Sequence, residues 1–196
     1  MTIKFDNDIS LILVSYKSKK KIINFLKYIP KYYKIIIIEN SADISLKNEI
    51  NKLYQNVDIY LNSNLGYGAA ANLGRSKINT KYFFLFNPDI EGVDEKFIKI
   101  FLETAKKLKN NFSCLGPRYN NISHKTLKQS NKNLEIGKVY AISGAAMFFY
   151  TKNFDKIGGF DENIFLYFEE TDYCKRARKK GYKIYQINSV NVVHPK

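Results

Sequence analysis

The chain has 196 residues, a hydrophobic content of 45% and a formal net charge of +14. This length suits one domain with a full hydrophobic core, so we expect a single domain over residues 1–196. The longest apolar stretch, near 139–150, falls short of the ~20 residues that a membrane-spanning helix needs. Cys114 and Cys174 have no metal-ligand spacing and no secretory leader is recognisable, so we expect a cytoplasmic protein with reduced thiols.

The positive charge comes mainly from runs of lysine, and three interpretations of these runs are possible. They can form a solvated surface without a specific partner, bind nucleic acid, or contact an anionic membrane. Charge alone does not choose among these readings. Because no nucleic-acid-binding motif is recognisable, we expect no nucleic-acid partner, and the solvated surface and peripheral membrane contact stay open.

The first half of the chain alternates strand-like and helix-like segments. Four strands separated by helices predict successive right-handed βαβ crossovers, and hence a doubly wound α/β sheet. The predicted elements are a strand at 9–16, a helix from Ser18 to Pro30, a strand at 33–39, a helix at 44–53, a strand at 57–62, a helix at 69–77 and a strand at 81–86.

The second half is less regular. A helix at 94–109 precedes a turn-rich section at 117–137 and an apolar run that ends at Tyr150. A second helix at 168–180 is followed by two short strands, KIYQI and NVVH. We expect mixed or antiparallel strand pairing in this half.

Polar side chains follow the predicted strands of the first half. Ligands of doubly wound sheets bind beyond the carboxyl ends of the strands, so these side chains should line one rim. They are Ser15, Tyr16, Glu39, Asn40, Asn62, Asn64, Asn87 and Asp89.

The apolar strand 81–86 is followed by the turn Asn87-Pro88-Asp89, so a carboxylate stands just after the strand end. A carboxylate at a strand end can bind Mg²⁺ or Mn²⁺, which often take one or two protein carboxylates together with phosphates and water. The structural alternative is a turn in which Asp89 only caps the next segment.

The segment 168–176 places Glu169, Glu170 and Asp172 in the first turn of a helix. The helix dipole favours acids there, and Asp172 and Arg176 have the spacing of a stabilising (i, i+4) pair. The functional alternative is a general base, because a carboxylate at a cleft edge can reach an acceptor hydroxyl.

Two further candidates are weak by themselves. Gly66 and Gly68 precede a helix, but 62–74 matches neither phosphate-loop pattern, so these glycines can serve close packing alone. His194 follows an apolar strand, and such a histidine is more often structural than a metal ligand.

In combination, these segments resemble the family 2 inverting glycosyltransferases, particularly the rhamnosyltransferase-like members. The resemblance covers nearly the whole chain, and its motifs occur in the family's order. They are LVSYKS, IIIIENSA, NSNLGYGAAANLG, FLFNPDI, ISGAAMFFY, the block FDKIGGFDENIFLYFEETDYCKRARKKGYKI, and His194.

The resemblance implies a GT-A fold, with a mostly parallel central sheet and an antiparallel extension on the acceptor side. It divides the domain into a nucleotide-sugar-binding half at 1–92 and an acceptor-side half at 93–196. It implies inverting transfer of a sugar from a UDP- or dTDP-linked donor. The acceptor would be a hydroxyl of a saccharide or lipid-linked glycan in the synthesis of bacterial surface polysaccharide such as O-antigen.

Site residues follow from the resemblance, position by position. Glu170 takes the place of the catalytic base, with Glu169 as the competing candidate, and Asp89 and His194 take the places of ligands to Mn²⁺ or Mg²⁺. The implied donor-binding residues are Ser15, Tyr16, Glu39, Asn40, Ser41, Asn64, Gly66, Asn72, Asn87 and Asp89. The implied acceptor-binding residues are Gly144, Phe168, Glu169, Asp172 and Arg176.

The chain departs from the family pattern at functional positions. Asn87 replaces the first acid of the metal-binding Asp-x-Asp motif, and Glu170 replaces the more usual Asp of the base. Related chains also continue well past the position of His194. These departures leave a catalytically weak nucleotide-sugar-binding domain as an alternative.

Overall fold

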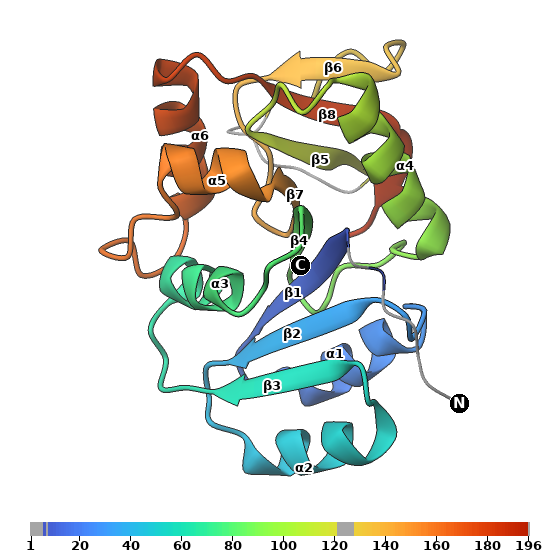
Figure 1. Ribbon diagram of the computed structural model, residues 1–196, viewed down its shortest axis with the longest axis vertical. Helices are drawn as coiled ribbons and strands as arrows, with labels where there is room; N and C mark the ends of the chain where they lie inside the picture. Colours follow the sequence, from blue (N-terminus) through green and yellow to red (C-terminus); the bar gives the residue numbers. More distant parts are fainter. Residues whose placement is uncertain (1–5, 7, 121–127, 196) are drawn as a thin grey trace.

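The computed structural model describes residue 6 and residues 8–120 and 128–195. One eight-stranded sheet, in the order β3-β2-β1-β4-β7-β5-β8-β6, forms the centre of the molecule (Figure 1). The strands are β1 Ile9–Ser15, β2 Lys34–Glu39, β3 Val57–Leu61, β4 Tyr82–Phe86, β5 Cys114–Tyr119, β6 Ile136–Val139, β7 Ala146–Tyr150 and β8 Ile184–Val192. The helices are α1 Lys19–Leu26, α2 Ile44–Leu53, α3 Tyr67–Ser76, α4 Glu95–Lys107, α5 Thr151–Ile157 and α6 Glu169–Lys179.

The first four strands are parallel, as their sequences predict. β1 pairs in parallel with both β2 and β4, and β2 pairs in parallel with β3. The run Ile35–Ile38 in β2 is buried because helices cover both faces of the sheet, which explains why this strand has no polar alternation. The register places Ser15 opposite Glu39, so the carboxyl ends of β1 and β2 lie together.

The second half of the chain extends the sheet with mixed pairing. β7 is antiparallel to both β4 and β5, β8 is parallel to β5, and β6 closes the edge antiparallel to β8. The predicted mostly parallel sheet with an antiparallel extension is therefore confirmed.

Helices cover both faces of the sheet, and side chains alternate between two cores (Figure 1). Leu11 and Leu13 of β1 face the core under α1, α2 and α4, whereas Ile12 and Val14 face the core under α3, α5 and α6. This alternation follows from the two-residue period of a strand.

Aromatic packing fixes the position of β4, the strand that leads to Asp89. The ring of Phe84 lies 4.6 Å from Phe86, 4.9 Å from Phe101 and 5.0 Å from Phe148, centroid to centroid. On the opposite face Phe83 stacks on Phe149 at 4.8 Å. Burial of each phenylalanine side chain contributes about 1.5–3 kcal/mol to the free energy of folding. This packing therefore fixes the position of the strand and of the turn that follows it.

Several local predictions were wrong or incomplete. The short helix α5 was not expected, and the two strands KIYQI and NVVH form the one strand β8, whose register with β5 shifts at Pro117/Arg118. Ser18 occupies the N-cap position of α1 without capping it, since its hydroxyl donates to the Tyr16 carbonyl oxygen at 2.8 Å. Residues 121–127 of the expected turn-rich section lie outside the described residues.

Candidate active site

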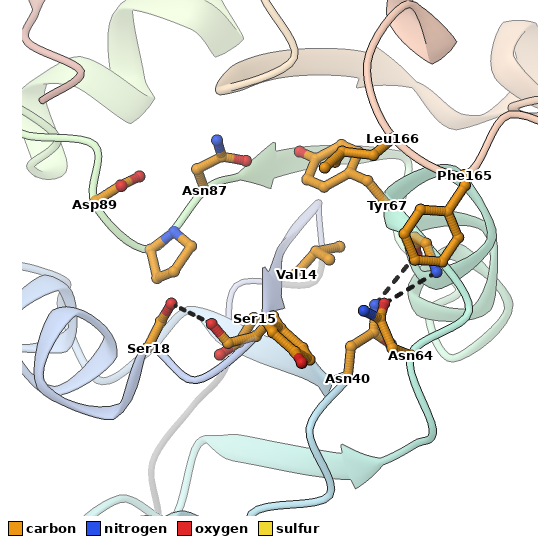
Figure 2. A pocket seen from close by; sticks show the side chains of 13 residues that line it. Val14, Ser15, Ser18, Asn40, Asn64, Tyr67, Asn87, Asp89, Phe165 and Leu166 are labelled. Carbon is orange, nitrogen blue, oxygen red and sulfur yellow. Dashed lines mark hydrogen bonds between the residues drawn. The ribbon is translucent and has the colours of Figure 1, made fainter. Parts of the chain in front are cut away.

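A cavity of about 230 Å³ opens beyond the carboxyl ends of β1, β2 and β4 (Figure 2). This is the edge at which the sequence predicts a ligand site. Of the predicted donor-binding residues, all except Glu39, Ser41 and Asn72 line the cavity. The lining consists of Val14, Ser15, Tyr16, Ser18, Asn40, Asn64, Gly66, Tyr67, Asn87, Pro88, Asp89, Phe165 and Leu166.

Glu39 does not line this cavity because its carboxylate is used by the backbone of the next turn. The side chain is fully buried and accepts hydrogen bonds from the N–H groups of Ser41 at 3.0 Å and Asp43 at 2.8 Å, and from the Ser41 hydroxyl at 2.6 Å. These hydrogen bonds order the turn after β2. Neither Glu39 nor Ser41 lines the cavity, and their contact with a donor stays a prediction.

Asn72 is likewise occupied elsewhere. Its amide donates to the Phe160 carbonyl oxygen and to Glu162, both at 2.9 Å, and its oxygen accepts from the Phe160 N–H at 2.9 Å. Asn72 thus fastens α3 to the loop after α5. Asn72 does not line the first cavity, and its role in donor binding stays a prediction.

Two buried polar atoms beside the cavity have no hydrogen-bond partner among the described residues. They are the hydroxyl oxygen of Ser15 and the amide oxygen of Asn40, whose amide nitrogen donates to the Gly66 carbonyl at 3.1 Å. Buried polar groups are normally paired, so such atoms commonly mark a place where water or a ligand binds. Both lie at the predicted donor rim.

Asp89 lies at the end of the cavity, between two nitrogen-bearing side chains. Its Oδ1 atom is 3.2 Å from His194 Nε2, and its Oδ2 atom is 2.8 Å from Lys21 Nζ. The hydrogen bond with His194, and next that with Lys21, lowers the pKa of Asp89 to about 2. Asp89 is therefore ionised throughout the physiological pH range.

A backbone bridge brings His194 to Asp89 across 105 positions of sequence. The Glu91 N–H donates to the Val193 carbonyl at 2.9 Å, and the Val193 N–H donates to the Glu91 carbonyl at 3.1 Å. His194 Nε2 also lies 3.2 Å from the amide nitrogen of Asn87. The predicted pairing of Asp89 with His194 is thus present in space, although no sequence spacing indicated it.

This donor set fits the implied metal ion. A carboxylate and an imidazole are ligand types that Mn²⁺ accepts, and phosphates and water can complete its coordination. Within the described residues, no group of three or more His, Cys, Asp or Glu side chains is placed to hold a metal ion. Protein ligands alone would therefore form an incomplete site, as expected for an ion that is shared with a diphosphate.

A second cavity, of about 610 Å³, adjoins the first. Tyr67, Asn87 and Leu166 line both cavities. The second also holds the predicted residues Gly144, Phe168, Glu169, Glu170 and His194, together with Tyr140, Ala141, Ser143, Ala145, Tyr167, Thr171 and Arg178.

Two curated proteins are similar in sequence over almost the whole chain. The low-salt glycan biosynthesis hexosyltransferase Agl10 of Haloferax volcanii is 25% identical, with 96% of this chain and 67% of that protein covered. The rhamnosyltransferase WbbL of Escherichia coli K12 is 24% identical, with 94% of this chain and 82% of that protein covered. No family model matches the chain.

Solved structures of glycosyltransferases have the same fold. GalNAc-T7, crystallised with UDP, GalNAc and Mn²⁺, superposes with a TM-score of 0.75 at 14% identity over 95% of this chain. Residues 1–349 of S. aureus TarS, in complex with UDP-GlcNAc, superpose with a TM-score of 0.73 at 16% identity over 96% of this chain. The chain therefore has the GT-A fold of these glycosyltransferases. It spans 43% of the GalNAc-T7 chain and 58% of the TarS chain.

The protein presents two adjacent carboxylates to the second cavity, at the start of α6. Burial is the main cause that raises the pKa of both Glu169 and Glu170, and the neighbouring charge of Glu170 raises that of Glu169 further. Glu169 is only 5% exposed, and its Oε2 atom has no partner among the described residues. Glu170 is more open to solvent, so a base that must meet an incoming hydroxyl is better placed at Glu170.

The side chains of Asp172 and Arg176 do not line the second cavity. Arg176 pairs with Asp172 at 2.7 Å and donates to the carbonyl oxygens of Gly158 and Gly159, each at 2.6 Å. These bonds fasten α6 to the turn after α5. These contacts give Asp172 and Arg176 a structural role, and their role in acceptor binding stays a prediction.

Tyr67 contributes to the site in a way that the sequence did not reveal. Its hydroxyl donates to the Gly144 carbonyl oxygen at 2.8 Å, so the ring forms part of the boundary between the two cavities. Burial raises the pKa of Tyr67 well above its usual value, which keeps the phenol neutral. The aromatic position was visible in the sequence motif, but only the fold places it between the cavities.

An exposed apolar segment, Phe165 to Phe168, contributes lining residues to both cavities. Tyr167 and Phe168 both have positive φ angles, 66° and 71°, which L-residues adopt only when their surroundings require it. The segment is bonded to the donor side by the Tyr67 N–H, which donates to the Phe165 carbonyl at 2.9 Å. Over the part of the chain that the structure describes, no helix has the length and hydrophobicity to cross a bilayer.

Proposed function

We propose that this domain transfers a sugar from a nucleotide-diphosphate sugar to a hydroxyl group of a saccharide or lipid-linked glycan. The observation that carries this proposal is the contact between the two cavities along Tyr67, Asn87 and Leu166. Ligands in the two cavities would meet at this boundary. Asp89 lies on one side of it and Glu170 on the other.

The first cavity is assigned to the donor. Asn40, Asn64 and Ser15 offer hydrogen-bonding groups to a nucleoside, and the unpartnered Ser15 and Asn40 oxygens support such contacts. UDP or dTDP is the proposed carrier. Support for a uridine nucleotide comes from TarS, which was crystallised with UDP-GlcNAc.

Transfer is proposed to be a single displacement with inversion. The acceptor hydroxyl oxygen forms a bond to the anomeric carbon while the bond from that carbon to the diphosphate oxygen breaks, and the electron pair leaves with the diphosphate. Glu170 accepts the proton of the hydroxyl. Its raised pKa brings the carboxylate closer to the range in which a general base works at neutral pH. Glu169, which is more deeply buried, supports the start of α6.

Asp89 and His194 would hold a divalent ion, Mn²⁺ or Mg²⁺, against the diphosphate. When bound, such an ion neutralises negative charge on the leaving group. The amide nitrogen of Asn87 lies 3.2 Å from His194 Nε2 and so helps to position the imidazole. Because Asn87 is neutral where the family pattern has an acid, the ion is held by less protein charge.

The second cavity is assigned to the acceptor, with Phe168 and Gly144 among its walls. The name of Agl10 places that relative in glycan biosynthesis, and WbbL is a rhamnosyltransferase of a bacterium. These two relatives support the proposed role in bacterial surface polysaccharide synthesis, such as that of O-antigen. The charge of +14 supports peripheral contact with an anionic membrane that carries a lipid-linked acceptor.

A second candidate function is nucleotide-sugar binding with little transfer. The Lys21 ion pair on Asp89 and the neutral Asn87 favour it, since both reduce the negative charge available to a metal ion. The two candidates share the donor cavity and differ only in turnover.

The test combines binding and turnover. Thermal unfolding is measured with UDP, dTDP, GDP or CMP, each with and without Mn²⁺, and a short oligonucleotide serves as the control. A ligand at 100 times its dissociation constant stabilises by about 2.7 kcal/mol, which moves the midpoint by several degrees. Stabilisation by one nucleotide, together with release of that nucleotide from its sugar donor when acceptor is added, supports the transferase. Stabilisation without turnover supports the binding domain, and a response to the oligonucleotide alone contradicts both.

A further inference from the structure

Lys21 makes an ion pair with Asp89 that links α1 to the turn after β4. The Nζ atom of Lys21 is 2.8 Å from Oδ2 of Asp89. Lys21 approaches from a third cavity, of about 520 Å³, which Asp89 also lines. The Asp89 carboxylate thus stands between this third cavity and the proposed donor cavity.

The pair differs from an ordinary surface ion pair because its acid is part of the candidate metal site. The Asp89 side chain is 20% exposed, whereas that of Lys21 is 55% exposed, so the lysine has more room to move away than the acid. The other carboxylate oxygen faces His194. Both oxygens of Asp89 therefore already have a nitrogen partner before a metal ion arrives.

We propose that Lys21 is a tethered cation that competes with the divalent metal ion for Asp89. On this view the metal ion binds fully only when the ammonium group has released the carboxylate. The inference rests on the proposed function, because it presupposes that Asp89 is a metal ligand.

Simple electrostatics gives the direction of the effect. An ammonium group within a few ångströms of a bound divalent cation repels it, and Asn87 supplies no negative charge to offset this repulsion. The long, flexible lysine stem lets the ammonium group move once another anion is near. A donor diphosphate is such an anion, so metal affinity should be weak in the nucleotide-free protein and should rise when the diphosphate is present.

The experiment measures Mn²⁺ binding directly. The electron paramagnetic resonance signal of free Mn²⁺ is titrated with nucleotide-free protein, for the wild type and for Lys21→Met, Lys21→Arg and Asp89→Asn. Lys20→Met is the matched control, since Lys20 is exposed on the same helix and its loss changes the net charge equally. Circular dichroism and the thermal midpoint establish that each variant is folded.

Lys21→Met is expected to bind Mn²⁺ roughly tenfold more tightly than the wild type, as partial relief of a short-range repulsion predicts. Lys21→Arg should retain the weak binding, and Lys20→Met should change affinity by less than about twofold because exposed distant charges are screened. An affinity of Lys21→Met that is equal to or weaker than that of Lys20→Met overturns the inference. If that happens while Asp89→Asn loses Mn²⁺ binding, the metal site itself stands. Unchanged binding in Asp89→Asn overturns the metal assignment as well.

Discussion

The carbonyl oxygen of Phe165 lies against Gly66, at a distance of 2.3 Å from the position that a Cβ atom on Gly66 would occupy. Gly66 has a φ angle of +86° and is the N-cap residue of α3, whereas Phe165 begins the apolar segment that continues into the wall of the second cavity. The absence of a side chain at Gly66 is thus what lets the two halves of the site meet. The adjacent Tyr67 N–H stabilises this contact by donating a hydrogen bond to the same carbonyl oxygen of Phe165.

Replacing Gly66 with alanine should therefore damage both fold and function. The positive φ angle costs about 1–2 kcal/mol for an L-residue, and the clash with Phe165 adds to that cost. We expect Gly66→Ala to lose about 3 kcal/mol or more of unfolding free energy and to weaken nucleotide binding. Urea denaturation and nucleotide titration measure the two effects.

Gly181→Ala is the matched control for this prediction. Gly181 has a nearly equal φ angle of +82° but no atom within 4 Å of the added Cβ, so only the backbone strain is imposed. Equal losses of stability in the two variants would show that the contact with Phe165 is unimportant.

Glu170→Gln should abolish proton acceptance while preserving the shape of the second cavity. We expect kcat to fall by about 10²- to 10⁴-fold, the usual contribution of a general base, with nucleotide affinity unchanged. Steady-state kinetics and nucleotide titration separate the two quantities. Glu103→Gln, on the exposed side of α4, is the control. A larger loss of kcat in Glu169→Gln than in Glu170→Gln would transfer the role of base to Glu169.

Glu169 should make stability depend on pH. Burial raises its pKa, so the folded protein binds this proton more tightly than the unfolded chain, and stability is lost as pH rises from the usual glutamate value through the raised one. Glu169→Gln removes this loss. Its unfolding free energy relative to wild type should therefore increase as the pH rises above about 4, the usual glutamate range. Urea unfolding at several pH values measures it, and a constant difference would contradict the prediction.

Arg176→Met should act on stability rather than on acceptor binding. It leaves the carbonyl oxygens of Gly158 and Gly159 without these donors, which costs about 1–3 kcal/mol. The KM for the acceptor should stay near that of the wild type in the folded fraction. A large rise in the KM for the acceptor without loss of stability would instead support the acceptor-binding role that the sequence predicts for Arg176.

Local patterns in the sequence predicted the parallel half of the sheet well. The apolar run of β2 and the Asn-Pro-Asp turn after β4 are recognisable from the local sequence alone. For this reason Asn40, Asn87 and Asp89 were correctly placed at the rim of the sheet. The functions of Asn72 and Arg176 were not readable in this way. Each bonds to backbone far away in sequence, such as Phe160 for Asn72 and Gly158 for Arg176, and only tertiary packing determines those partners.

The resemblance to a family and the physical contacts also answer different questions. Glu39 matches an acidic family position, yet its oxygens are fully engaged by Ser41 and Asp43. A motif fixes which residue type stands at a position, whereas the direction of the side chain depends on which donors lie closest to it.

The backbone bridge between Glu91 and Val193 has a practical consequence for handling the protein. The bridge holds His194 against Asp89. Pro195 lines the third cavity together with Asp89, so a segment added beyond Pro195 would begin close to this carboxylate. A polyhistidine purification tag on that side would bring extra imidazoles to the proposed Mn²⁺ ligands and distort metal titrations.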